Sequence, residues 1–96
     1  MEVRWTPEAS SRLELIKRRI ENDSPEAALR TVVAIFESIE KLSSFPYRCR
    51  VVREPGTREL VIPGLPYIAV YRVRESVIEI LQIWHGAQSR AERGIK

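Results

Sequence analysis

The stretch from Gly56 to His85 constrains the fold of this chain more than any other part of its sequence. It reads GTRELVI, then PYIAVYRV, then a charged bend at Glu75-Ser76, then VIEILQIWH, so breakers separate a series of strand-like runs. The last run is apolar on both faces at its centre, which predicts a central position in a sheet. A sheet built from these runs needs other elements to cover one of its faces.

The first half of the chain has the periodicity of helices. Thr6-Pro7-Glu8 and Ser24-Pro25-Glu26 each combine a hydroxyl cap, a proline suited to the first helical position and an acid in the first turn. Because the link at Asn22-Asp23 is short, the two helices are expected to pack antiparallel, as a hairpin. Apolar residues recur at helical spacing along each of them, namely Ala9, Leu13, Ile16 and Ile20 in the first and Ala28, Val32, Ile35, Ile39 and Leu42 in the second.

These patterns predict an α+β fold in a single domain that covers residues 1–96. Val3 and Trp5 would lie in a short N-terminal strand. The helical hairpin would pack on one face of a mainly antiparallel sheet of four to five strands, and the opposite face would carry arginines and stay partly open. Residues 86–96 are polar and are predicted to form a frayed helix or a flexible tail.

Composition excludes several classes of protein. No apolar run approaches the roughly 20 residues that cross a bilayer, and the start, MEVRWTPEAS, has no signal-peptide core. Cys49 and His85 are the only residues of their kinds, so neither a disulfide framework nor a thiolate or zinc cluster is expected. The sequence therefore predicts a cytoplasmic protein that uses no metal and no cofactor.

The charge is unevenly distributed along the chain. Residues 1–44 hold 7 basic and 8 acidic side chains, a net charge of −1, whereas residues 45–96 hold 9 basic and 5 acidic side chains, a net charge of +4. Eight of those nine basic groups are arginines, whose planar donor fork suits carboxylate or phosphate. This half of the molecule is either a solvated basic face or a docking surface for nucleic acid or an acidic partner.

Arg58 and His85 are the two residues in which the pattern indicates chemistry. Arg58 shares a strand face with Leu60 and Ile62, so its guanidinium needs a partner. That partner is either Glu79 across the sheet, in a structural ion pair, or a phosphate or carboxylate of a ligand. His85 ends the last strand, where it is either a general base near neutral pH or a partly buried histidine bonded to a backbone carbonyl.

Other arginines and one tyrosine are candidates for contact with a target or a partner. Arg48, Arg50 and Arg53 form a basic strand or loop, which either contacts phosphate or only prevents edge-to-edge pairing. Tyr71 lies on a strand face, where it either packs or stacks on bases. The predicted binding set is Arg48, Arg50, Arg53, Arg72 and Tyr71.

The order and spacing of these features resemble the RelE/ParE toxins of bacterial toxin–antitoxin pairs. The resemblance rests on the early strand, the Ala27-Ala28 pair that opens the second helix, the Pro46 after it, and the runs GTRELVI, PYIAVYRV and IEILQIWH followed by a small residue and a polar tail. It covers nearly the whole chain. It implies a small cytoplasmic toxin held in a hetero-oligomer by a cognate antitoxin, which wraps an extended or helical segment over the toxin's basic groove.

This family has two activities. RelE-like members cut messenger RNA in the ribosomal decoding site, where basic side chains stabilise the charge that develops on the phosphate. ParE-like members, which include plasmid-stabilisation proteins, poison DNA gyrase and do no known chemistry. RelE-like nucleases usually have Arg as the second residue of the run that matches Tyr67 to Tyr71, and Ile68 fills that place here. The chain also lacks the Lys-rich strand and C-terminal Tyr of that branch, and its IWHGAQSR ending looks more like the ParE type.

The resemblance therefore implies a gyrase-poisoning toxin neutralised by an antitoxin. The alternative that it leaves open is a ribosome-dependent endoribonuclease acting on mRNA, with Arg58 and His85 in the site and help from Arg48 or Arg50. A third hypothesis is a degenerate module that retains only antitoxin contact, and whether the chain is an enzyme depends on which of these holds. The +4 surplus predicts that an acidic or amphipathic antitoxin segment docks against the arginines, Arg72 included.

Overall fold

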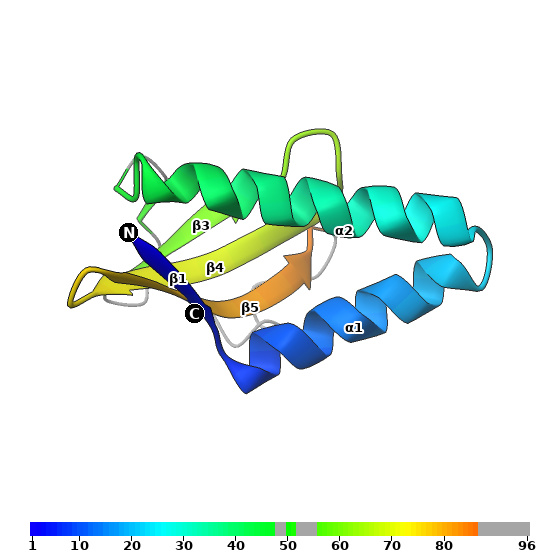
Figure 1. Ribbon diagram of the computed structural model, residues 1–96, viewed down its shortest axis with the longest axis horizontal. Helices are drawn as coiled ribbons and strands as arrows, with labels where there is room; N and C mark the ends of the chain where they lie inside the picture. The colour runs from blue at the N-terminus through cyan, green and yellow to red at the C-terminus, as the bar shows by residue number, and fades with distance from the viewer. Residues whose placement is uncertain (48–49, 52–55, 87–96) are drawn as a thin grey trace.

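A computed structural model describes residues 1–47, 50–51 and 56–86 of the chain. Two helices lie side by side over one face of a sheet, and the chain starts at the edge of that sheet (Figure 1). The elements in chain order are β1 (Glu2–Trp5), α1 (Pro7–Glu21), α2 (Pro25–Glu40), the 3₁₀ helix η1 (Lys41–Ser43), β2 (Arg50–Val51), β3 (Thr57–Val61), β4 (Tyr67–Arg74) and β5 (Val77–His85).

The strands form one five-stranded sheet in the order β1-β5-β4-β3-β2. β1 pairs with β5 in parallel, whereas β2 with β3, β3 with β4 and β4 with β5 are antiparallel. The predicted α+β fold, with an N-terminal strand and a helical hairpin on one face of a mainly antiparallel sheet, is confirmed. β5 lies between β1 and β4, which explains why its centre is apolar on both faces.

Both helices start at the predicted caps. The hydroxyl of Thr6 accepts a hydrogen bond from the backbone N–H of Ala9 at 3.2 Å, and the hydroxyl of Ser24 accepts one from Ala27 at 3.1 Å. Thr6 also donates its hydroxyl hydrogen to the carbonyl of Ile80 at 2.8 Å. The cap of α1 is therefore tied to the centre of β5, and this fixes where the hairpin begins relative to the sheet.

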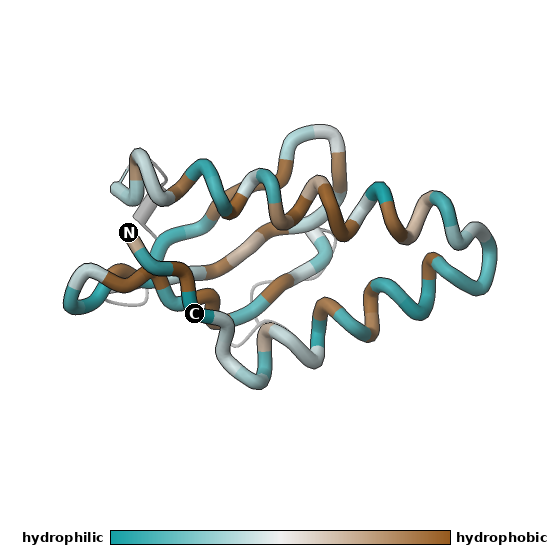
Figure 2. Tube along the Cα trace, viewed as in Figure 1, coloured by the Kyte–Doolittle hydropathy of each residue, from teal (hydrophilic) through white to brown (hydrophobic). Residues whose placement is uncertain are grey.

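The core lies between the hairpin and the sheet. Hydrophobic segments of both helices turn toward each other and toward the strands, and hydrophilic segments turn outward (Figure 2). The predicted helical stripes are buried or partly buried at every position. The buried core consists of Ala9, Leu13, Ile16, Ile35, Ile39, Leu42, Ile62, Ala69, Tyr71, Ile78, Ile80 and Ile83.

A register shift between β4 and β5 decides which way the end of β5 faces. Tyr71 pairs with Ile80 and Val70 pairs with Gln82, so one extra residue stands on β5 at this point. Such a bulge reverses the alternation of side chains along the strand. Beyond it, Ile83 is fully buried against the helices, and the next residue on that face is His85, opposite Tyr67. Strict alternation from Val77 would have placed His85 on the other face.

Candidate functional site

Arg58 lies on the helix side of the sheet, on the face that the sequence predicted. Its guanidinium donates a hydrogen bond to the carbonyl of Tyr47 at 3.1 Å and lies over the Tyr47 ring, 5.2 Å from its centre. Register pairs Arg58 with Tyr71, which is fully buried among the core residues. Arg58 therefore contacts Tyr47, in the segment that follows α2 and η1, and does not project from the open face of the sheet.

The suggested ion pair between Arg58 and Glu79 is wrong. Glu79 lies between Ile78 and Ile80, which face the helices, so its carboxylate projects from the opposite face. There it accepts a hydrogen bond from Arg72 at 2.7 Å, with Arg74 3.8 Å away. The hydrogen bond from Arg72 and the charge of both arginines hold the pKa of Glu79 below its usual value.

His85 is exposed at the end of β5, which corrects the expectation of a partly buried side chain. Its ring meets the Tyr67 ring edge to face, with centroids 5.6 Å apart. Tyr67 belongs to the neighbouring strand and directly opposes His85 in the register. The contact holds the imidazole on the side of the sheet that α1 covers.

The structure does not bring Arg58 and His85 together. They oppose Tyr71 and Tyr67, which stand four positions apart on β4, so the offset along the strand is about 13 Å. They also lie on opposite sides of β4, which adds a lateral offset of about 10 Å. The two side chains have different neighbours on the helix side of the sheet, Tyr47 for Arg58 and Tyr67 for His85.

The predicted binding set is dispersed in the same way. Arg72 projects from the face away from the helices and is engaged by Glu79. Tyr71 is fully buried and donates its hydroxyl to the carbonyl of Pro46 at 2.8 Å, so it cannot contact a partner in this structure and the prediction for it is corrected. Arg50 lies in β2, opposite Glu59. The predictions for Arg48 and Arg53 fall outside the described residues.

Ile68 occupies an apolar environment on the face away from the helices. It pairs with Val61 on β3 and with Trp84 on β5. Val61 is 62% exposed, so this part of the sheet presents aliphatic and aromatic surface to solvent. The aliphatic side chains of Ile68 and Val61 offer no donor to a phosphate oxygen, and they are suited to contact with another apolar surface instead.

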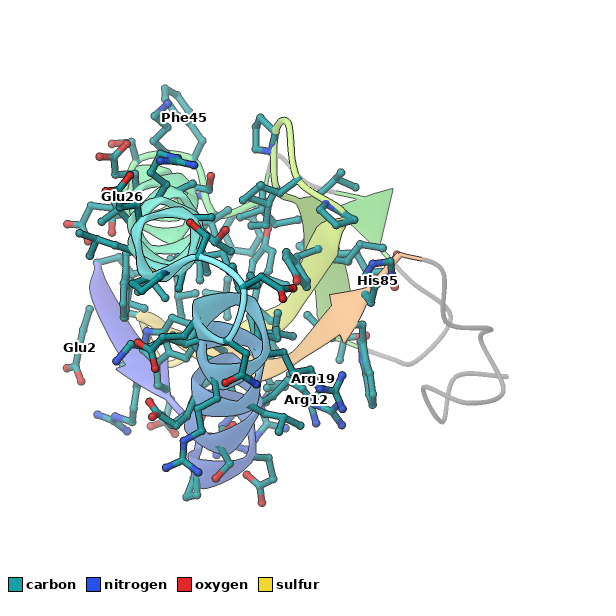
Figure 3. All side chains as sticks on the ribbon, turned by 90° about the vertical axis from the view of Figure 1, so that its right-hand side faces the viewer. Glu2, Arg12, Arg19, Glu26, Phe45 and His85 are labelled. Carbon is teal, nitrogen blue, oxygen red and sulfur yellow. The ribbon has the colours of Figure 1, made fainter. Side chains whose placement is uncertain are left out.

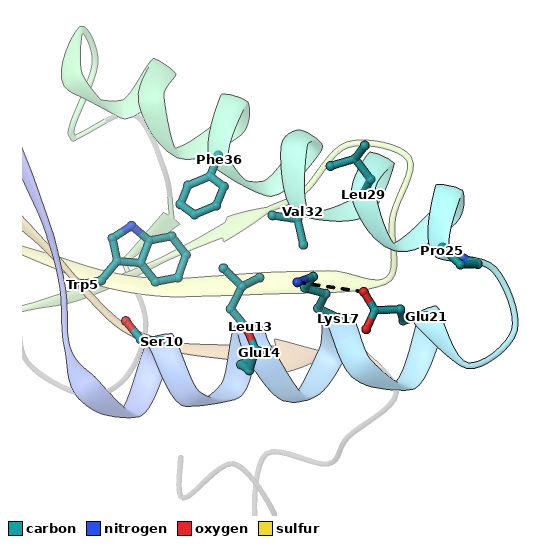
Figure 4. Close-up of a pocket in the computed structure, with 10 residues that line it drawn as sticks. All are labelled: Trp5, Ser10, Leu13, Glu14, Lys17, Glu21, Pro25, Leu29, Val32 and Phe36. Atoms are coloured by element: carbon teal, nitrogen blue, oxygen red, sulfur yellow. Dashed lines mark ion pairs between the residues drawn. The ribbon is translucent and has the colours of Figure 1, made fainter.

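A groove lies between α1 and α2. It has a volume of about 700 Å³, and Trp5 and Phe36 close one end of it, with ring centroids 5.3 Å apart. Leu13 and Val32 form its floor, and Leu29 stands at its rim (Figure 4). Toward the loop between the helices, Lys17 and Glu21 of α1 form an ion pair of 3.9 Å at its edge.

The outer side of α2 extends this apolar groove. Leu29, Val33 and Phe36 are 65%, 43% and 47% exposed. Their spacing of four and three residues places them in one stripe, beside the stripe that faces the core. An apolar stripe left in solvent by the folded chain is typical of a protein–protein contact. The sequence contained this signal, because α2 is apolar over more of its circumference than one buried face requires.

The described residues hold little that could support metal or membrane chemistry. Within residues 1–47, 50–51 and 56–86, His, Cys, Asp and Glu do not gather in groups of three that could hold a metal ion. Among the same residues, neither helix is long and apolar enough to cross a bilayer.

Comparison with known proteins points to one family. Residues 3–90 match the sequence model of the family described as ParE toxin of type II toxin-antitoxin system, parDE. The chain is also similar to one chain of a solved structure, the chromosomal ParDE TA system from P. aeruginosa. The TM-score is 0.80 at 31% sequence identity, over 88% of this chain and 95% of that chain.

Two relatives are similar over nearly their whole length. The protein Y4kP of Sinorhizobium fredii is 42% identical over 86 residues, which is 90% of this chain and 88% of that protein. The toxin RelE2 of Caulobacter vibrioides is 30% identical over 87 residues, which is 91% of this chain and 97% of that protein. The matching family and the solved structure carry the ParE or ParDE name, whereas the Caulobacter relative is named RelE2, so likeness alone does not separate the two activities.

Proposed function

Because this chain belongs to the ParE toxins of type II toxin–antitoxin systems, we propose that it stops bacterial growth by poisoning DNA gyrase in the cytoplasm. In the same proposal, an antitoxin made alongside it holds it inactive in a hetero-oligomer. The observation that carries the proposal is the separation of Arg58 from His85, which leaves the two candidate catalytic residues on opposite sides of β4. In this proposal the toxin acts by binding its target.

The surface around Ile68 supports the same conclusion. A ribonuclease that cuts at the 2′-hydroxyl must stabilise negative charge on the phosphate with preorganised donors. At the position where the related nucleases have arginine, this chain has an aliphatic residue between Val61 and Trp84. Arg72, the nearest described arginine on that face of β4, is already engaged by Glu79.

The apolar groove supports a binding mechanism for both the target and the antitoxin. Its rim exposes Leu29 and Phe36, which are large enough to anchor a protein–protein contact. An antitoxin that covers this groove would exclude any target that uses the same residues. Neutralisation then needs only a higher affinity for the antitoxin and no change in the toxin's fold.

The experiment that tests this proposal is a gyrase cleavage assay. Purified chain, gyrase, ATP and plasmid DNA are incubated together, and detergent then releases any DNA held in a broken state. We expect linear plasmid to accumulate with the wild-type chain. Arg58→Ala and His85→Ala should give as much linear DNA as the wild type, because neither residue takes part in chemistry.

The relatives named RelE make the ribonuclease the competing hypothesis. In a parallel reaction, the same proteins are added to ribosomes that carry a defined message. Cleavage of the message by the wild type, lost in Arg58→Ala and His85→Ala while the fold is kept, would reject the gyrase mechanism. No DNA cleavage, no message cleavage and no growth arrest would instead identify a module that only binds its antitoxin.

A further inference from the structure

A second hollow lies on the other side of α1 from the apolar groove, between that helix and the end of β5. Its volume is about 290 Å³, and its lining consists of Arg12, Ile16, Arg19, Tyr67, Ile83 and His85. Arg12 and Arg19 leave α1 on the side that faces the end of β5, where His85 stands (Figure 3). The predicted binding set includes none of the α1 residues in this lining.

The two arginines have no carboxylate partner in the described part of the chain. Glu8 and Asp23 stand one turn before Arg12 and one turn after Arg19, where helical ion pairs commonly form. Neither pair forms within residues 1–47, 50–51 and 56–86, although Arg18 meets Glu14 at 3.3 Å on the same helix. The donors of Arg12 and Arg19 are therefore available to a ligand.

Aromatic contacts hold two of the cationic or titratable groups in place. The guanidinium of Arg12 lies 5.2 Å from the centre of the Trp84 ring, in a cation–π contact. The ring of His85 is held by Tyr67. A site whose side chains are already positioned loses less entropy when a ligand binds.

The spacing of the charges indicates what kind of ligand fits. Arg12 and Arg19 are seven residues apart on α1, which is about 10 Å along the helix axis. Two separate anionic groups can therefore be bound at once. Ile16 lies between the arginines and Ile83 lies across from it, so the floor between the two cations is apolar. A ligand with an apolar group between two carboxylates matches this order of surfaces.

We infer that the hollow between α1 and the end of β5 binds an acidic, amphipathic segment of a protein partner, with carboxylates on Arg12 and Arg19 and an apolar side chain over Ile16. This inference rests on the proposed function for the identity of the partner, which would be the antitoxin. A nucleic-acid strand fits less well, because aliphatic side chains, Ile16 and Ile83, rather than an aromatic ring on which a base could stack, form the floor between the arginines. The inference also moves the predicted docking site of the antitoxin from the face that carries Arg72 to the α1 side of the sheet.

The test uses the ¹⁵N-labelled full chain and a short synthetic peptide in which glutamates flank a leucine. NMR titration should shift the side-chain signals of Arg12, Arg19 and His85. Arg12→Gln and Arg19→Gln should each weaken binding about tenfold, because each removes charge-assisted hydrogen bonds. Arg18→Gln, the matched control on the same helix, should bind as the wild type does. Unchanged backbone spectra show that each variant is folded.

Several results would overturn the inference. A peptide with glutamines in place of the glutamates should not bind. If it bound as tightly as the glutamate peptide, the carboxylates would not contribute to recognition. If Arg18→Gln weakened peptide binding as much as Arg12→Gln or Arg19→Gln does, binding would depend only on the net charge of the chain. Preferential binding of a single-stranded oligonucleotide or of inorganic phosphate at Arg12 and Arg19 would assign the site to phosphate. None of these results depends on gyrase, so failure here and failure of the proposed function are distinguishable.

Discussion

At the scale of single residues, what matters is which arginines are already engaged. Arg72 and Arg58 belong to the basic half of the sequence, but Glu79 and Tyr47 hold them. Arg12 and Arg19 belong to the half with net charge −1, yet within residues 1–47, 50–51 and 56–86 no carboxylate pairs with either of them. A count of charges along the sequence therefore does not show which cations are already paired.

Glu79 should make stability depend on acidity in a specific way. Its pKa is lowered in the folded chain, chiefly by the hydrogen bond from Arg72. Its contribution to stability is therefore fully present above the ordinary glutamate pKa, about 4.3, and is lost as the pH falls through the lower, folded value. In urea unfolding from pH 7 downward, the difference between wild type and Glu79→Gln should shrink on acidification. If the difference in stability between the two proteins grew on acidification, the pKa of Glu79 would not be lowered in the folded chain.

Tyr71 should behave as a structural residue. Tyr71→Phe removes the hydrogen bond to the Pro46 carbonyl and should lower the free energy of unfolding by about 1 kcal/mol. Affinity for the antitoxin should stay unchanged, because the side chain is fully buried. Chemical denaturation and a binding titration measure the two effects, and Tyr67→Phe, whose hydroxyl bonds to none of the described residues, is the control. If Tyr71→Phe weakened antitoxin binding and left stability unchanged, Tyr71 would belong to the binding surface after all.

At the scale of elements, the sequence predicted most of the local structure because the signals were local. Both helix starts depend on a hydroxyl and a proline within three residues, and both appear where expected. The bend at Glu75-Ser76 is also a local signal, and it became the turn between β4 and β5. The bulge opposite Tyr71 had no such signal, because it depends on how two strands align. For that reason the face on which His85 lies could not be predicted.

The turn between β4 and β5 predicts a stabilising substitution. Glu75 and Ser76 have φ values of 52° and 65°, which side-chain-bearing residues adopt at a cost. Ser76→Gly should raise the free energy of unfolding by about 0.5–1 kcal/mol, because glycine removes that strain. Gly64 has a φ of 75°, so Gly64→Ala should lower stability by a similar amount. Thermal unfolding measures the midpoint temperature of both variants. If the midpoint shifted in the same direction for both, backbone strain would not explain the changes in stability.

The apolar stripe on α2 should affect binding much more than stability. Leu29→Asp changes a side chain that is 65% exposed, so the free energy of unfolding should change by less than about 0.5 kcal/mol. Affinity for the antitoxin should fall by about tenfold or more, because a charge would enter an apolar contact. Phe45→Asp is the control, since Phe45 is also exposed but lines neither the groove nor the hollow between α1 and the end of β5. Equal losses of affinity in the two variants would remove the groove from the interface.

At the scale of the whole molecule, pairing between distant segments determines which side chains lie together, and local sequence patterns do not predict this pairing. A first strand was predicted, but its parallel pairing with β5 joins the two ends of the described chain, and no local pattern encodes it. The same topology separates Arg58 from His85 by placing their strands on opposite sides of β4. It also places α1 beside the end of β5, which assembles Arg12, Arg19 and His85 from distant parts of the sequence.

The fold thus presents two hollows beside α1 and places the candidate catalytic residues on different strands. The apolar groove and the cationic hollow lie on either side of α1, so one antitoxin segment that crosses this helix could contact both. We propose that the toxin acts by binding gyrase rather than by cutting RNA.

The most direct test is pulse-labelling of DNA and protein synthesis in bacteria that express the chain without its antitoxin. The account predicts an early fall in DNA synthesis with induction of the SOS response, and the same time course for His85→Ala. Protein synthesis should decline only later. An early fall in protein synthesis with cut messenger RNA, abolished by Arg58→Ala or His85→Ala, would contradict the account and place those residues in a catalytic site.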